Sequence, residues 1–215
     1  CIRDSDVPVV GDCRLAVEGI NEISRNKFSG QDMASRHAQW IETIGEWKRE
    51  QPLTYAKGDK YLKPQHVVRV LNEITGGNAI ITTEVGQNQM WAAQFYDFDK
   101  PRTLITSGGL GTMGYGFPAA IGAQVAFPNK LVIDIAGDGS IQMNIQEMAT
   151  AVQNKLPVKI VILNNTYLGM VRQWQELFYD RRYSFTELAN PDFGLIARGN
   201  GLSYRCVERL SLIHI

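Results

Sequence analysis

Two short apolar segments that end in polar residues constrain the fold of this chain most strongly. Leu131–Ala136 is followed by Gly-Asp-Gly, and Val158–Leu163 is followed by two asparagines. Their length and β-branched content are typical of buried parallel strands. The separation of Asp138 and Asn165 leaves room for one helical crossover, which would bring both polar strand ends to the same edge of a sheet.

Asp138 and Asn165 are therefore candidate ligands of one metal ion. A carboxylate, an amide oxygen and a nearby backbone carbonyl form a hard oxygen site that suits Mg²⁺, with further positions left for phosphate groups. Gly137 and Gly139 would let backbone N–H groups approach those phosphates. The alternative is ordinary turn chemistry, because Asp-Gly and Asn-Asn are both frequent in turns. The helical pattern after Asp138 favours the metal site over a hairpin.

The crossover is predicted to be one helix over residues 141–154. Ile145, Met148, Ala149 and Val152 recur at helical spacing, and the Lys-Leu-Pro sequence that follows should end the helix.

Other strands and helices are predicted upstream of this crossover. Pro64 should begin a helix that Gly76 and Gly77 end. Strands near residues 79–83 and 103–106 alternate with helical patterns. We therefore expect an α/β fold, with a doubly wound, mostly parallel sheet and helices on both faces.

The chain is expected to be a fragment with four parts. Residues 1–25 should close a preceding domain with a short apolar strand, a turn and a helix that ends near Ser24. Residues 26–62 are predicted to be an interdomain linker, with Trp40 and Trp47 on an amphipathic stretch that Pro52 ends. Residues 63–209 should form the site-bearing domain, truncated after a last strand that begins near residue 201. Residues 210–215 are predicted to be a non-native tail.

Composition excludes several function classes. The 22 basic and 22 acidic side chains balance, which gives no basic excess for nucleic acid. No apolar run approaches the ~20 residues that a membrane span needs. The three cysteines and three histidines are scattered along the chain, so neither a disulfide framework nor a zinc site is expected, and a cytoplasmic location is the default.

A glycine cluster between residues 108 and 116 allows a competing interpretation. Its segment 109–114 matches the G-x-G-x-x-G pattern of dinucleotide-binding folds, but no acidic residue follows at the usual distance. A phosphate-binding P-loop is excluded because the Gly-Lys-Ser/Thr ending is missing. An ordinary connection from a strand to a helix remains the plain alternative.

The motifs resemble those of thiamine-diphosphate-dependent enzymes. Gly-Asp-Gly followed at this distance by Asn-Asn carries that resemblance, and Leu163–Tyr179 is similar to the corresponding segment of acetolactate synthase catalytic subunits. The similarity continues through residues 84–94 and 106–124, and it covers most of the chain from about Tyr61 to about Arg205.

The resemblance implies specific roles for residues of the predicted site. Mg²⁺ would be bound by Asp138, the Asn165 side chain and the backbone carbonyl of Tyr167, while Met170, Val171 and Trp174 would face the substrate. The residues implied to bind thiamine diphosphate are Val85, Gly86, Gln87, Asn88, Gly111, Met113, Gly137, Asp138, Gly139, Ser140, Asn165, Tyr167, Leu168, Gly169 and Met170.

Asn88 and the apolar residues that begin at Met170 each carry an alternative interpretation. Asn88 stands where many family members have a histidine beside the diphosphate, and either side chain can donate a hydrogen bond to phosphate. The apolar stripe that begins at Met170 and Val171 and continues through Trp174 to Phe178 has helical spacing, which usually marks core.

The activity implied is the condensation of two 2-oxo acids with loss of CO₂, giving acetolactate or acetohydroxybutyrate. The activating glutamate of the family would lie in a domain outside this chain, so Glu84 and Glu147 are interpreted as structural. FAD binding stays open, because its residues would lie mainly upstream. The resemblance also implies a homodimer or tetramer, with Trp91 and Phe95 as candidate interface or core residues, and a regulatory small subunit. The alternatives are another thiamine-dependent carboligase, decarboxylase or oxidase, and an inactive binding fragment.

Overall fold

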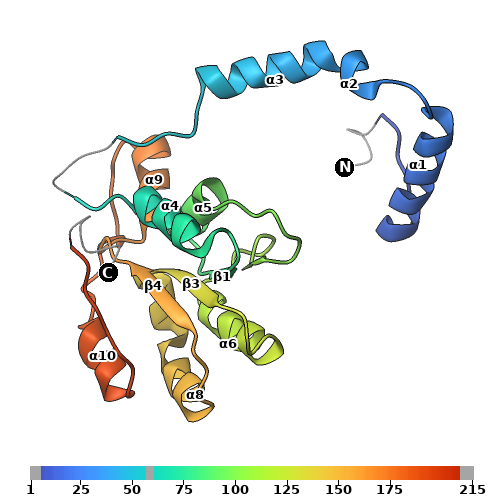
Figure 1. Ribbon diagram of the computed structural model, residues 1–215. Helices are drawn as coiled ribbons and strands as arrows, with labels where there is room; N and C mark the ends of the chain where they lie inside the picture. Colours follow the sequence, from blue (N-terminus) through green and yellow to red (C-terminus); the bar gives the residue numbers. More distant parts are fainter. Residues whose placement is uncertain (1–5, 57–60, 209–215) are drawn as a thin grey trace. The chain divides into compact units, whose positions relative to one another are not determined.

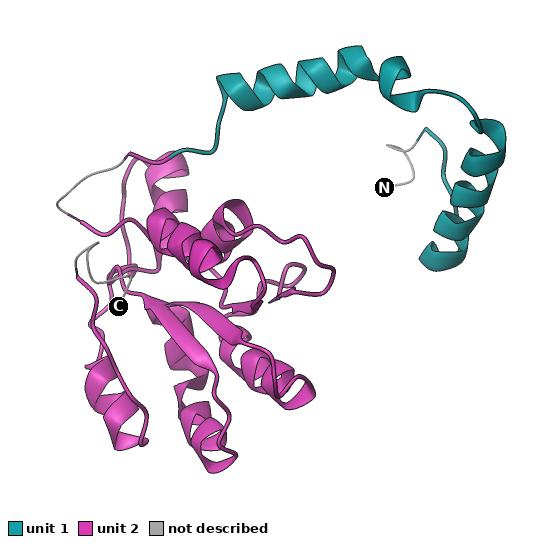
Figure 2. Cartoon of the chain, viewed as in Figure 1, with its two compact units in different colours: residues 1–54 teal, residues 55–215 magenta. Residues whose placement is uncertain are grey.

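The computed structural model describes residues 6–56 and 61–208, and the chain divides into two compact units. Unit 1 comprises residues 1–54 and unit 2 comprises residues 55–215 (Figure 2). The predicted tail at residues 210–215 lies outside the described residues.

Unit 1 is helical, and none of its described residues is buried. Its helices are α1 (Cys13–Lys27), α2 (Met33–Arg36) and α3 (Ala38–Glu50). The carboxylate of Asp12 caps α1 by accepting hydrogen bonds from two backbone N–H groups in the first turn. In α3, Trp40 and Trp47 pack edge to face, with ring centroids 5.5 Å apart.

One prediction for unit 1 is wrong. Residues 7–10 form no strand, because no neighbouring strand pairs with them within the described part of unit 1. The helix predicted after them does form, but it continues past Ser24 to Lys27, where basic residues in its last turn favour the helix C-terminus.

Unit 2 is built around a parallel four-stranded sheet in the order β2-β1-β3-β4. The strands are β1 (Ile80–Thr83), β2 (Leu104–Thr106), β3 (Val132–Gly137) and β4 (Lys159–Leu163). All four predicted strands are therefore confirmed within one or two residues. From β2 the chain crosses back over β1 to reach β3, so the strand order reverses between β1 and β3. Ligands of open α/β sheets bind at the carboxyl ends of the strands beside such a reversal.

Helices cover both faces of this sheet, as Figure 1 shows. On one face, α4 (Pro64–Thr75) and α5 (Gln87–Phe95) pack on alternate strand residues such as Ile81 and Ile135. On the other face lie α6 (Gly116–Ala126), α8 (Met148–Gln153) and α10 (Phe193–Gly199). The predicted doubly wound α/β fold is confirmed.

The predicted ends of α4 are also confirmed. Pro64 is the first residue of α4, and Gly76 caps its C-terminus in a left-handed conformation with φ of 56°.

The crossover between β3 and β4 is not the single helix that was predicted. It consists of α7 (Asp138–Ile141), the 3-10 helix η2 (Gln142–Glu147) and α8. The break lies at Asn144, where φ is −135°, and the Asn144 side chain donates a hydrogen bond to the Gly114 carbonyl at 2.6 Å. After this break, α8 turns a different face toward the sheet than one continuous helix would.

This rotation changes which residues reach the core. Of the four apolar residues at helical spacing, Met148 is buried and Ile145 is partly buried, but Ala149 and Val152 are exposed. Ala151 is buried instead. The last strand predicted from about residue 201 is also absent, since residues 202–208 have no regular secondary structure.

Candidate functional site

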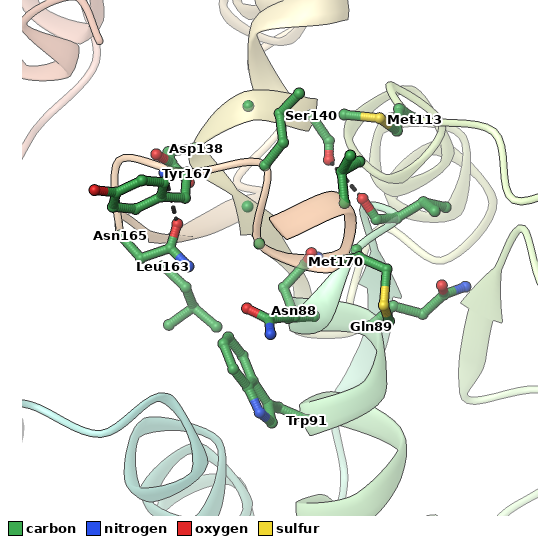
Figure 3. Close-up of a pocket in the computed structure, with 18 of the residues that line it drawn as sticks. Asn88, Gln89, Trp91, Met113, Asp138, Ser140, Leu163, Asn165, Tyr167 and Met170 are labelled. Atoms are coloured by element: carbon green, nitrogen blue, oxygen red, sulfur yellow. Dashed lines mark hydrogen bonds between the residues drawn. The ribbon is translucent and has the colours of Figure 1, made fainter. Parts of the chain in front are cut away.

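A pocket of about 270 Å³ opens at the carboxyl ends of β1, β3 and β4 (Figure 3). All fifteen residues predicted to bind the cofactor line it, and so does Val171. Trp174 is not among the lining residues. Sequence reasoning missed Gln89, Trp91 and Leu163, which also line the pocket and lie within the segments that carry the family resemblance.

The segment after β1 brings the start of α5 to the pocket. Val85, Gly86 and Gln87 line it in succession, and α5 begins at Gln87. Gly86 has φ of 150°, and a Cβ there would lie 3.0 Å from the Asn88 side-chain oxygen. A glycine is therefore needed at this bend. The first residues of α5 line the pocket, and the N-terminus of a helix suits an anion.

Asp138 and Asn165 reach the pocket from neighbouring strands. Asp138 follows β3 directly and is 1% exposed. Asn165 follows β4, and its Oδ1 accepts a hydrogen bond from the Tyr167 backbone N–H at 3.0 Å. This bond turns the chain through Thr166, which has φ of 60°, toward α9 (Gly169–Phe178). Figure 3 shows Asp138, Asn165 and Tyr167 at one side of the pocket.

These groups fit a hard divalent cation. One carboxylate, one amide oxygen and one backbone carbonyl are the oxygen donors that Mg²⁺ prefers when it also keeps phosphate or water ligands. Within residues 6–56 and 61–208, no cluster of three or more His, Cys, Asp or Glu side chains could hold a metal. A transition-metal site of nitrogen or sulfur ligands therefore has no candidate in that part of the chain.

Two of the residues that line the pocket must be glycines, because a side chain there would collide with neighbouring residues of the site. A Cβ on Gly139 would lie 2.7 Å from Leu168 Cδ2, and a Cβ on Gly169 would collide with the Gln87 side chain and lie 3.2 Å from Asn165 Nδ2. Any side chain at these positions would displace residues of the site itself.

Asn88 is held by the sheet. It is buried, and its Nδ2 donates to the carbonyls of Glu84 at 2.9 Å and Ile135 at 2.8 Å. Both amide hydrogens are therefore engaged by backbone, and the side-chain oxygen lies toward Gly86 and Gly137. In this structure Asn88 ties the end of β1 to β3, and its side chain has no free N–H for a phosphate.

Glu84 is buried and holds the start of α6. Its Oε2 accepts a hydrogen bond from Gly114 N at 2.7 Å, and its Oε1 accepts one from Phe117 N at 3.0 Å. Burial raises the pKa of Glu84, while these N–H donors act in the opposite direction. This placement agrees with the structural role expected for Glu84.

A second buried acid, Asp134, lies in the middle of β3. Thr82 donates a hydrogen bond to its Oδ1 at 3.0 Å, and Oδ2 has no partner among the described residues. Burial raises the pKa of Asp134 well above its usual range, and the charge of Glu84 adds to the shift. The sequence offered no sign of this pair, because an acid inside an apolar strand run fits no motif.

On the side of the pocket away from Asp138, two methionines line the cavity together with Ser140 and Gln89. Met113 and Met170 lie away from Asp138 in Figure 3. Gly111, with φ of 66°, brings the backbone of its loop to the cavity. Thioether side chains adapt their shape and contact aromatic rings favourably. The pocket thus offers oxygen donors near Asp138 and thioether side chains further away, which suits an elongated ligand with a charged group and a ring.

The apolar stripe of α9 is not core in this structure. No residue of α9 is buried; Val171 is 46% exposed and Trp174 is 56% exposed. Phe95, by contrast, is a buried core residue, and the partly buried Trp91 packs against the same core.

Comparisons with known proteins agree with this geometry. Residues 84–213 match the family model described as thiamine pyrophosphate enzyme, C-terminal TPP binding domain. The acetolactate synthase isozyme 3 large subunit of Escherichia coli is 46% identical over 198 residues, which is 92% of this chain and 34% of that protein. The mitochondrial acetolactate synthase catalytic subunit of Saccharomyces cerevisiae is 48% identical over 208 residues, which is 94% of this chain and 30% of that protein.

A cyanobacterial relative covers nearly all of the chain. The acetolactate synthase large subunit of Parasynechococcus marenigrum is 47% identical over 214 residues, which is 99% of this chain and 34% of that protein. The chain thus spans about a third of the length of the curated relatives it matches. Since the family match extends over more than half of its residues, the chain belongs to the thiamine pyrophosphate enzymes and carries their C-terminal TPP binding domain.

Proposed function

We propose that the pocket binds thiamine diphosphate through a Mg²⁺ ion held by Asp138, Asn165 and the Tyr167 carbonyl. The observation that carries the proposal is that these three residues and the start of α5 open into the same pocket. The cation and the helix N-terminus would neutralise the diphosphate from two sides.

The residues of this chain would orient the cofactor by its two ends. Backbone N–H groups near Gly137 and Gly139 would approach the diphosphate, because no side chain blocks them. Met113 and Met170 would pack against the rings and exclude water from them. Ser140, whose Oγ donates to the Val85 carbonyl at 3.1 Å, would keep the two phosphate-binding segments together.

The wider proposal is that this chain is the cofactor-binding part of an acetolactate synthase catalytic subunit. It rests on relatives of 46–48% identity that carry this name in bacteria and yeast. When bound, thiamine diphosphate supplies the reactive carbon that breaks and forms bonds beside the 2-oxo group of the substrate. Met170 and Val171 would contact the 2-oxo acids, with Trp174 one helical turn further along α9. The activating glutamate and any FAD would belong to regions outside this chain.

Partners follow from the same proposal. The exposed apolar residues of α9 favour burial against another domain or subunit, in keeping with the expected homodimer or tetramer. A regulatory small subunit and a cytoplasmic location also remain part of the proposal, although some relatives are chloroplastic or mitochondrial. In the part of the chain that the structure describes, no helix has the length and apolar character of a membrane span.

The test is acetolactate formed from pyruvate by the full-length protein, with and without thiamine diphosphate and Mg²⁺. We expect product only with both, a loss of product in Asp138→Asn, and normal product in Asp99→Asn, the matched change at an exposed aspartate. Cofactor binding with a different product would identify another thiamine-dependent enzyme. If the 215 residues taken alone bind the cofactor without turnover, they are the inactive binding fragment.

A further inference from the structure

The carboxylate of Asp138 has a partner far along the chain. Asn190 lies in the segment between α9 and α10, and its Nδ2 donates a hydrogen bond to Asp138 Oδ2 at 2.6 Å. The same Nδ2 donates to the side-chain oxygen of Asn164 at 3.0 Å. Asn190 thus connects the loop after β3 to the loop after β4.

A second amide closes a ring on Asp138. The Nε2 of Gln142 donates to the Asp138 backbone carbonyl at 2.9 Å and to Asn190 Oδ1 at 2.9 Å. The ring therefore runs from the carboxylate through Asn190 and Gln142 to the backbone of the same aspartate. Gln142 also fixes the orientation of the Asn190 amide, so that its nitrogen faces Asp138.

The segment that carries Asn190 is anchored beside the Tyr167 loop. Leu168 N donates to the Thr186 carbonyl and Leu188 N donates to the Thr166 carbonyl, each at 2.8 Å. Thr186 is buried. These bonds hold the segment against the loop from which Asn165 extends, so Asn190 approaches Asp138 from a supported backbone.

We propose that Asn190 is a positioning residue for the divalent cation, with Gln142 as its support. The inference rests on the proposed metal site and deepens it. A hydrogen bond to Oδ2 fixes the rotation of the carboxylate, and Oδ1, which takes part in none of these bonds, is left for the cation. An amide suits this role because it donates two hydrogen bonds without adding a charge that would compete with the ion.

The test is Mn²⁺ binding to the full-length protein at saturating thiamine diphosphate, measured by electron paramagnetic resonance. Asn190→Ala and Gln142→Ala should each raise the Kd for Mn²⁺ by about 10- to 100-fold, the usual effect of removing a group that orients a metal ligand. Both side chains belong to one ring of hydrogen bonds. The Kd of the double variant should therefore rise by less than the product of the two single increases. Asn154→Ala is the matched control: its amide bonds only the Thr150 carbonyl, and the Kd should not change.

Thermal unfolding of the metal-free variants separates positioning from a purely structural role. A Kd within twofold of the wild type in Asn190→Ala would overturn the inference, whether or not the melting temperature falls. If Asp138→Asn abolishes Mn²⁺ binding while Asn190→Ala does not, the inference fails and the proposed metal site stands. If the wild type itself binds no Mn²⁺, both fail together.

Discussion

Replacing Gly116 by alanine should destabilise unit 2 and damage the cofactor pocket at the same time. Gly116 begins α6 and lies directly against the end of β1. A Cβ there would collide with the Glu84 backbone nitrogen and would lie 2.5 Å from both the Thr83 carbonyl carbon and Asp134 Oδ1. Two of these three atoms belong to the backbone of the sheet edge and cannot rotate away, so α6 or the end of β1 must move.

The expected cost follows from that collision. Overpacking of a core costs about 1–3 kcal/mol, and a clash with backbone belongs at the upper end, about 3 kcal/mol. For a chain of this size the melting temperature should fall by about 6–12 °C. The shift would also displace Val85 and Gln87, which follow Glu84 into the pocket, so the affinity for thiamine diphosphate should fall as well.

Gly122 provides a control in the same helix. It is exposed, and a Cβ there would meet nothing within 4 Å. Gly122→Ala should therefore stabilise the protein by about 0.5–1 kcal/mol, because alanine loses less backbone entropy in a helix. Thermal unfolding followed by circular dichroism measures both variants. Equal shifts for the two, or a Gly116→Ala protein that melts within about 1 °C of the wild type, would refute the reasoning.

Three further changes test other parts of the account. Gly169→Ala should weaken cofactor binding in a calorimetric titration, with little loss of stability, since its Cβ meets the flexible Gln87 side chain and Asn165. Asn88→Ala should cost about 1–3 kcal/mol in urea denaturation, because it strips two backbone carbonyls of their amide donor. The raised pKa of Asp134 means that stability present at acid pH is lost as the pH rises through that pKa. Asp134→Asn should remove this dependence, so its free energy of unfolding, relative to wild type, should rise as the pH increases above about 4, the ordinary pKa of an aspartate; parallel pH profiles would contradict the assignment.

The strands of unit 2 could be predicted because the sequence signals for them are local. Each is a short apolar run with a polar or glycine boundary, and the parallel order follows from the helical patterns between them. The crossover helix was predicted wrongly because its break depends on a tertiary contact: Asn144 reaches Gly114, thirty positions away in the sequence. Helical periodicity carries no information about such a bond.

The residues of the site also differ in whether local sequence signals could predict them. Asp138 and Asn165 could be placed at one edge from strand ends alone, and the family resemblance supplied most of the other lining residues, but not Gln89, Trp91 or Leu163. Asn190 could not be found, since it lies in an irregular segment 52 positions from Asp138. The Asn-Pro-Asp sequence that begins there signals only the start of α10. The role expected of Asn88 differs from its observed contacts because burial, not residue type, decides where its amide points.

The central claim is that this pocket binds thiamine diphosphate through a cation on Asp138. Isothermal titration of thiamine diphosphate into the full-length protein, in Mg²⁺ and again in a chelator, tests it most directly. We predict binding in Mg²⁺ that is lost in the chelator and in Asp138→Asn, and that is retained in Asp99→Asn. Equal affinity with and without the metal, or undiminished binding by Asp138→Asn, would contradict it.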